Sequence, residues 1–166
     1  MIFLTVGTQL PFDRLARAVD AWCARTGRGD EVFGQIGELG AGSYRPERFE
    51  WAEKIPPETF RAKVGAARLI VSHAGMGSII SAMQAGVPIL VMPRRAHLGE
   101  HRNDHQQATV TRLAGRPGLI AARDEADLPD LLDRHAAPGA ARDGTRLPPF
   151  ADPALIAALR DFIHRS

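Results

Sequence analysis

The chain has 166 residues, 45% of them hydrophobic, and its 21 basic and 19 acidic side chains give a formal net charge of +2. This length suits one compact domain with a real core, and the well-mixed charges argue against a nucleic-acid-binding surface. The single cysteine, Cys23, excludes an internal disulfide and is expected to be a buried apolar side chain. We expect a cytoplasmic protein, because the longest apolar run is too short to cross a bilayer and no signal-peptide pattern is present.

The start of the chain predicts a strand, a glycine turn and a helix. Residues 1–6 form an apolar run typical of a buried strand, and residues 15–22 carry apolar side chains at helical spacing. Gly7 and Thr8 lie in the turn between them, where a doubly wound sheet holds phosphate, although a plain strand-to-helix turn explains the same residues equally well. No complete G-x-G-x-x-G motif follows, so a nicotinamide cofactor is not expected.

Two further strands and a helix are predicted before the middle of the chain. Residues 31–37 and 48–51 are the strand candidates. The pair Pro56–Pro57 stops any strand and can start a helix, because proline is tolerated in the first helical turn.

Residues 69–93 predict a strand, a glycine-rich turn, a helix and a second strand. Neither apolar run alternates with polar residues, so both strands should be buried on two faces, as in a parallel sheet covered by helices. Gly75 and Gly77 allow a tight turn, and a helix starting near Ser78 would point its positive end at the space beyond the strand. Since ligands of open parallel sheets bind at that edge, this unit predicts an anion site.

The most polar and histidine-rich segment, residues 94–106, follows the second of these strands. Its side chains should converge on the same edge of the sheet. His101 and His105 are four residues apart and would share a helix face, which raises a metal site with Asp104 or His97 as third ligand. The lack of an H-E-x-x-H or D-x-D motif argues against that site. In the alternative interpretation, one of the two residues before His105 is the N-cap of the next helix.

The last third predicts one more strand and two helices. The strand is expected at residues 118–122 and a short helix at 127–135. Residues 136–149 are rich in alanine, proline, glycine and arginine without a period, which indicates a flexible loop. A final helix is expected at about 152–164.

Three segments carry a resemblance to a known family. They are TVGTQLPFD at 5–13, SHAGMGS at 72–78 with AGVP at 85–88, and NDHQ at 103–106. In order and spacing they resemble the C-terminal, donor-binding half of family 28 glycosyltransferases of GT-B architecture. More narrowly, the chain is similar to small stand-alone subunits of split transferases: the PssE/EpsF type of exopolysaccharide synthesis, and the soluble subunit of the dolichol-pathway N-acetylglucosaminyltransferase. The implied fold is α/β, a Rossmann-like doubly wound parallel sheet forming a single GT-B half-domain over residues 1–166.

The resemblance implies a UDP-sugar at the carboxyl edge of the sheet. By position in the family motifs, the diphosphate would lie on the loop after the first strand, the uracil on the segment around residue 54, the phosphate and ribose near the central turn, and the sugar near Gln106. The donor-binding residues implied are Gly7, Thr8, Gln9, Lys54, Ile55, His73, Gly75, Met76, Gly77, Ser78, Glu100, Asn103, Asp104, His105 and Gln106. One departure is Ser81, which stands where a relative carries a ribose-binding glutamate.

The implied reaction is attack of an acceptor hydroxyl on the anomeric carbon with inversion, and UDP leaves. No metal and no other cofactor is expected, so the charge growing on the β-phosphate must be stabilised by backbone N–H groups and cationic side chains. The glycine turns would supply the N–H groups. His73, Arg94 and His97 are the cationic candidates for the catalytic role.

The acceptor half of the GT-B fold has no counterpart in these residues. The resemblance therefore implies a membrane-anchored partner subunit with the acceptor site, a lipid-linked saccharide acceptor, and a location at the inner face of the plasma membrane. The transferred sugar, a hexose or a uronic acid, stays open. A non-catalytic enhancer subunit is the alternative. An epimerase or dehydrogenase is disfavoured, because Tyr44 is followed four residues later by Arg48 and not by lysine.

Overall fold

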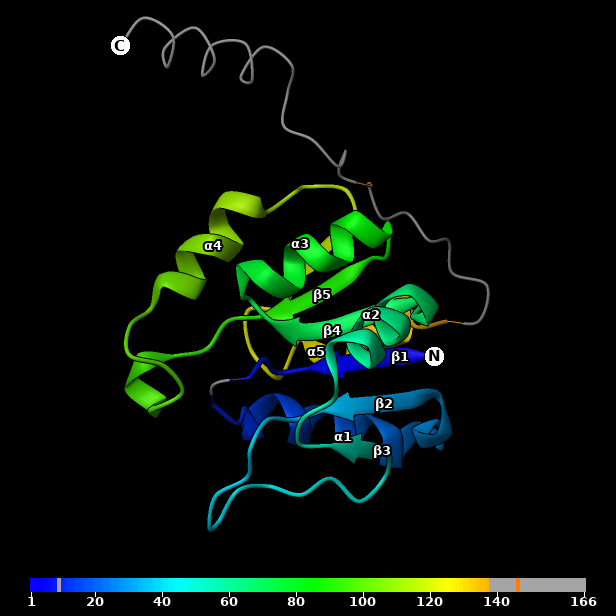
Figure 1. Ribbon diagram of the computed structural model, residues 1–166. Coiled ribbons are helices and arrows are strands. Elements are labelled where there is room, and N and C mark those ends of the chain that lie inside the picture. Colours follow the sequence, from blue (N-terminus) through cyan, green and yellow to red (C-terminus); the bar gives the residue numbers. More distant parts are fainter. Residues whose placement is uncertain (9, 138–145, 147–166) are drawn as a thin grey trace, which may run out of the picture.

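The computed structural model describes residues 1–8, 10–137 and 146, and within them six strands form one parallel sheet (Figure 1). The strands are β1 (Ile2–Thr5), β2 (Val32–Gln35), β3 (Glu50–Ala52), β4 (Leu69–His73), β5 (Ile89–Met92) and β6 (Leu119–Ala121). Their order across the sheet is β3-β2-β1-β4-β5-β6, and every neighbouring pair is parallel. This confirms the predicted Rossmann-like α/β fold.

Helices cover both faces of the sheet. They are α1 (Asp13–Thr26), α2 (Pro57–Ala66), α3 (Met76–Ala85), α4 (His105–Leu113) and α5 (Leu128–His135), with short 3₁₀ turns η1 (Gly29–Glu31) and η2 (Ala96–Leu98). Helices α1 and α5 pack in one core cluster, and α2, α3 and α4 in the other, so the two sets lie on opposite faces (Figure 1). Because both faces are covered, β1 and β5 bury every residue and β4 buries all but His73, as the uninterrupted apolar runs predict.

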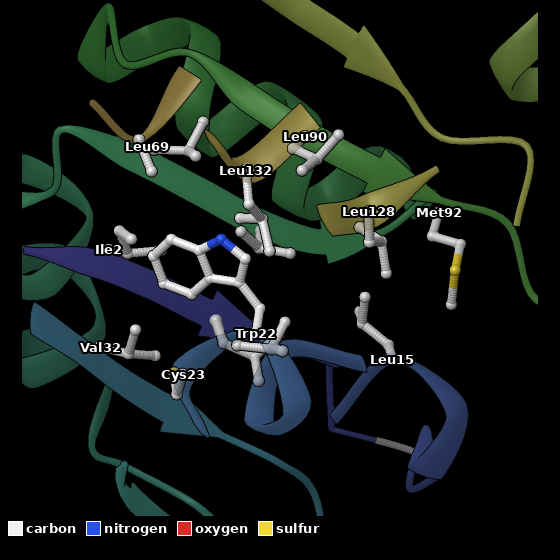
Figure 2. Packing of buried hydrophobic residues seen from close by; sticks show 14 of the residues in the cluster. Ile2, Leu15, Trp22, Cys23, Val32, Leu69, Leu90, Met92, Leu128 and Leu132 are labelled. Carbon is white, nitrogen blue, oxygen red and sulfur yellow. The ribbon is translucent and has the colours of Figure 1, made fainter. Parts of the chain in front are cut away.

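Trp22 of α1 is the largest side chain buried in the first cluster. Figure 2 shows it near Ile2 of β1, Val32 of β2, and Leu132 of α5. Cys23 lies in the same cluster and is 2% exposed. Burial raises the pKa of its thiol to about 12, so the predicted role as an apolar filler is confirmed.

The order in which strands are added to the sheet reverses between β1 and β4. From β1 the chain moves outward through β2 and β3, and then returns to β4 on the other side of β1 before it moves out through β5 and β6. The carboxyl ends of β1 and β4 therefore form the switch point of the sheet, where ligands of such folds bind.

Most predicted elements are present, with two corrections. Helix α3 begins at Met76, two residues earlier than the predicted start near Ser78, with Gly75 at the N-cap position. The prediction that His101 and His105 share a helix face is wrong, because α4 begins only at His105. The predicted helix at 152–164 and most of the predicted loop at 136–149 lie outside the described residues.

Leu132 offers a test of how far α5 anchors the first core cluster. Its side chain is fully buried, so Leu132→Ala is expected to lower the free energy of unfolding by about 2–5 kcal/mol. Leu131→Ala is the matched control, because Leu131 only borders the same cluster and is partly buried. Urea denaturation should give a clearly larger loss for Leu132→Ala, at an unchanged m-value. Equal losses would contradict the packing described for α5.

Candidate functional site

A cavity of about 1000 Å³ opens at the carboxyl ends of β1 and β4. Its size lies at the upper end of the range of about 300–1,000 Å³ for small-molecule sites. Its walls come from the turns after β1 and β4, the start of α3, helix α2, and the first turn of α4. Eleven of the predicted site residues line it: Gly7, Thr8, Lys54, Ile55, His73, Gly75, Gly77, Ser78, Arg94, His105 and Gln106.

The cavity lining is basic. Lys54, Arg61 and Arg94 contribute cationic side chains, whereas no aspartate or glutamate belongs to the described residues that line it. Lys54 is paired with Glu38, 2.5 Å away and outside the lining. Such a surface attracts anions and lacks the carboxylate ligands that magnesium prefers.

The imidazole of His73 fills the space between the two turns. A Cβ atom added to Gly75 would lie 2.2 Å from its Nε2, and one added to Gly7 would lie 2.9 Å from its Cε1. Only glycine at both positions leaves room for the ring. The two glycines thus make room for the His73 ring, a role that the spacing of the motif did not suggest.

His73 is neutral at physiological pH, which corrects the prediction of a cationic side chain. Burial lowers the pKa of its imidazole to about 4, and the positive charge of Arg94 acts in the same direction. His101, from the segment before α4, adds a smaller effect of the same sign. His73 can therefore offer a hydrogen-bonding nitrogen to a ligand, but no fixed positive charge.

Arg94 follows β5 and is 2% exposed. Its guanidinium donates hydrogen bonds to the carbonyl oxygens of Val6 (2.9 Å), Leu10 (2.7 Å) and Pro11 (2.7 Å). Burial lowers the pKa of Arg94 to about 10, so the group stays charged at neutral pH. Since its donors are directed at these carbonyls, Arg94 holds the loop after β1 in place, which differs from the predicted contact with the leaving phosphate.

Gln35 was not predicted as a site residue, although it organises the same loop. At 3% exposure, its Oε1 accepts a hydrogen bond from the Thr5 hydroxyl at 2.7 Å. Its Nε2 donates to the carbonyl oxygens of Gly7 (3.0 Å) and Glu53 (2.9 Å). Gln35 thus joins the two loops that the resemblance assigns to diphosphate and uracil. The sequence signal for Gln35 is that it is a polar residue near the end of the predicted strand at residues 31–37.

The start of α3 presents backbone amides to the cavity. The N–H of Gly75 already donates to the carbonyl oxygen of His73 at 2.8 Å, and the N–H of Gly7 lies 3.5 Å from the Thr5 hydroxyl oxygen. The first N–H groups of a helix have no acceptor inside the helix, and those of Gly77 and Ser78 find none among the described residues. These two amides, at the positive end of the α3 dipole, are the donors available to an anion.

Gln106 lies in the first turn of α4 and is 3% exposed. Its Oε1 accepts a hydrogen bond from the backbone N–H of Arg94 at 3.1 Å. This bond fixes the orientation of the side-chain amide, and leaves its NH₂ group as the donor on the cavity side.

Several predicted site residues do not line the cavity: Met76, His97, Glu100, Asn103 and Asp104. The carboxylate of Glu100 instead accepts bonds from the guanidinium of Arg14 at 2.8 Å and from the backbone N–H of Arg95 at 2.8 Å. Asp104 accepts from the N–H of Ala96 at 2.9 Å. Because α4 starts only at His105, both acids lie in the segment before the helix. Their hydrogen bonds hold that segment in place.

The other three residues have their own placements. The side chains of Met76 and His97 are exposed outside the cavity, and the side-chain oxygen of Asn103 bonds the Nδ1 atom of His105. Gln9 lies outside the described residues.

Helix α2 and the segment before α4 add residues to the cavity that the sequence did not single out for the donor site. Phe60 and Arg61 come from α2, and His101 precedes α4. The ring of His101 meets that of His105 edge-on, with centroids 4.6 Å apart. Within the described part of the chain, no three histidine, cysteine or acidic side chains gather as a metal site would need.

None of the helices in the described residues combines the length and the apolar character that a bilayer span requires.

The fold and the cavity define a class: a Rossmann-like α/β domain with a basic, acid-free cavity at the switch point of its sheet. The sequence profile of the glycosyltransferase family 28 C-terminal domain matches residues 1–141. The chain therefore belongs to this family, and its fold is that of a GT-B half-domain.

Solved structures agree with this fold at low sequence identity. MurG of Acinetobacter baumannii superposes with a TM-score of 0.66 at 17% identity, over 100% of this chain and 50% of that one. The glycotransferase of kitacinnamycin gives 0.57 at 22% identity, over 96% of this chain and 37% of that one. The solution structure of ALG13 gives 0.53 at 15% identity, over 95% of this chain and 93% of that one. No curated protein sequence matches the chain.

The chain thus spans 50% of MurG and 37% of the kitacinnamycin enzyme.

The depressed pKa of His73 predicts an acid-sensitive fold. The unfolded chain takes up the proton near pH 6.5 and the folded chain only near pH 4, so the unfolding free energy falls as pH drops through this window. The loss is at most about 3.5 kcal/mol, because the pKa falls from 6.5 to about 4 and each pKa unit corresponds to about 1.4 kcal/mol. Urea denaturation from pH 7 to pH 4 should show a smaller loss for His73→Gln than for the natural chain. The exposed His97→Gln is the control, and identical pH profiles for His73→Gln and the natural chain would contradict the assignment.

Gly75 and Gly77 form a matched pair that tests the space around His73. The backbone of Gly75 (φ −88°, ψ 133°) suits any residue, so the obstacle to alanine there is the His73 ring. Gly75→Ala is expected to destabilise the fold by about 1–3 kcal/mol, as overpacking does. A Cβ atom on Gly77 meets nothing within 4 Å, and alanine in this helical turn should be neutral or stabilising by up to about 1 kcal/mol. Thermal or urea denaturation of both variants checks this order.

Proposed function

We propose that this chain is the donor-binding and catalytic subunit of a two-subunit inverting glycosyltransferase. It would transfer a sugar from a UDP-sugar to a polyprenyl-diphosphate-linked saccharide in exopolysaccharide or capsule synthesis. The observation that carries the proposal is the cavity at the switch point, which is basic, free of acidic side chains and lined by helix-start amides. Membership of the family 28 C-terminal domain family supports the same reaction class.

A UDP-sugar fits the distribution of groups around the cavity. The amides of Gly77 and Ser78 are suited to the diphosphate, because they are unpaired donors at the positive end of α3, and the hydroxyl of Thr8 adds a donor from the loop after β1. Lys54 and Ile55 line the end of the cavity that the resemblance assigns to uracil. The Gln106 amide is suited to sugar hydroxyls.

The reaction breaks the bond between the anomeric carbon and the β-phosphate oxygen while the acceptor oxygen forms a new bond to that carbon. The electron pair of the broken bond stays on UDP, and the acceptor hydroxyl loses its proton. Amides already oriented toward the phosphate would stabilise the growing charge without reorganisation. No carboxylate of the described lining could take the proton, so we propose that the base belongs to the acceptor half.

The acceptor half would come from a membrane-anchored partner. The matched part of the chain corresponds to half or less of MurG and of the kitacinnamycin enzyme, whereas ALG13 is covered over 93% of its length. A solved chain of this size with this fold supports a donor half that exists as a separate polypeptide. Through that partner the protein would act at the inner face of the plasma membrane.

Calorimetric titration of the purified chain with UDP tests the donor site. We expect binding in EDTA that magnesium does not change, because the cavity offers donors and no carboxylates, and we expect no binding of NAD. Arg61→Gln should weaken the affinity for UDP about two- to fivefold, since an exposed charge contact contributes up to about 1 kcal/mol. The control is Arg116→Gln, an exposed arginine outside the cavity lining. Affinity that needs magnesium would contradict the metal-free site.

Co-expression with the membrane partner tests the division of labour. Full transfer to a lipid-linked acceptor by this chain alone would overturn the two-subunit proposal. In the assembled pair, His73→Ala should lower turnover. Unchanged turnover would favour the non-catalytic enhancer.

A further inference from the structure

Ser72, the residue before His73 on β4, has a side chain that the donor site as described above does not use. It is fully buried, and its hydroxyl oxygen lies 2.8 Å from the carbonyl oxygen of Thr5 and 3.2 Å from Nδ1 of His73. The hydroxyl therefore bridges β1 and the imidazole, at the point where the two central strands end.

The hydrogen of this hydroxyl has one good direction. A carbonyl oxygen can only accept, so the short contact with Thr5 requires Ser72 to donate. The oxygen of Ser72 is then left as an acceptor toward His73. A neutral imidazole satisfies it by carrying its proton on Nδ1.

The other edge of the ring faces the cavity. Gly7 and Gly75 flank Cε1 and Nε2, and His73 lines the cavity. Among the described residues, Nε2 has no hydrogen-bond partner, and it is not one of the buried unsatisfied atoms. This nitrogen is the one that a ligand can reach.

We infer that Ser72 is a positioning residue, which keeps the proton of His73 on Nδ1 and presents Nε2 to the ligand as a hydrogen-bond acceptor. The inference rests on the proposed function for its meaning in donor binding. An unprotonated Nε2 repels a phosphate oxygen and accepts a hydrogen bond from a hydroxyl. The group of the nucleotide sugar that meets His73 is therefore a hydroxyl, and the phosphate is left to the amides of α3.

The charged and titratable groups around His73 favour the neutral ring. Burial lowers the pKa of the imidazole to about 4, and the charges of Arg94, which follows β5, and of His101, from the segment before α4, act in the same direction, whereas a hydrogen bond of the ring with the Thr5 backbone acts in the opposite one. Between pH 6 and pH 8 the ring therefore carries one proton, which is held by either Nδ1 or Nε2.

Long-range ¹H–¹⁵N NMR of the full chain, without ligand at pH 7, separates protonated from unprotonated ring nitrogens. We expect His73, assigned by comparison with His73→Gln, to be protonated on Nδ1. In Ser72→Ala the proton should move, wholly or in part, to Nε2, the form that histidine prefers in water, and Ser72→Thr should restore Nδ1. Ser81→Ala is the control, because the Ser81 hydroxyl lines the cavity but bonds the carbonyl of Gly77.

A proton on Nε2 in the natural chain, or no difference between the natural chain and Ser72→Ala, would overturn the inference. Both results are independent of UDP binding, so they are distinguishable from failure of the proposed function.

A double-mutant cycle on UDP affinity supplies the second arm. If Ser72 acts through His73, Ser72→Ala should weaken UDP binding in the natural chain and have no further effect in His73→Gln. Equal effects in both backgrounds would mean that Ser72 contributes only to the fold.

Discussion

The packing of one imidazole between two glycine turns is the constraint on which the site depends. The turns after β1 and β4 approach each other because these strands are neighbours at the switch point, and His73 fills the space between Gly7 and Gly75. The ring is anchored through Ser72 to the end of β1. As a result, the same contact sets the shape of this part of the cavity and the orientation of the His73 ring.

Buried polar side chains extend this constraint outward. Arg94 binds three carbonyl oxygens of the loop after β1, and Gln35 joins that loop to the segment after β3. Gln106 ties α4 to the backbone at Arg94. A buried polar group that is fully hydrogen-bonded specifies one geometry, because any other arrangement leaves a costly unpaired atom. Through these bonds the three side chains hold the walls of the cavity in place, and Gln106 keeps its NH₂ group as a donor toward the cavity.

The structure gives the predicted cationic residues other roles than contact with the phosphate. Charge stabilisation was assigned to His73, Arg94 and His97, yet the first is neutral, the second is bonded to carbonyls, and the third is exposed outside the cavity. The groups left free to face an anion are instead the α3 amides and the exposed side chain of Arg61, while Lys54 is paired with Glu38. In the proposed donor site, the unpaired groups that face an anion are therefore mainly backbone amides.

The sequence alone determined the order of the elements, the parallel sheet, and the turns that form the site. Apolar runs without alternation, such as residues 69–71, report burial on two faces, and that information is local. Only the tertiary structure decided which side chains reach the cavity. Glu100 binds Arg14, which is distant in the sequence, and does not line the cavity. Gln35 of β2 and Arg61 of α2 do line it. Pairing across such sequence distances, and the dependence of a pKa on burial and neighbouring charge, follow from the packed arrangement, which no local pattern encodes.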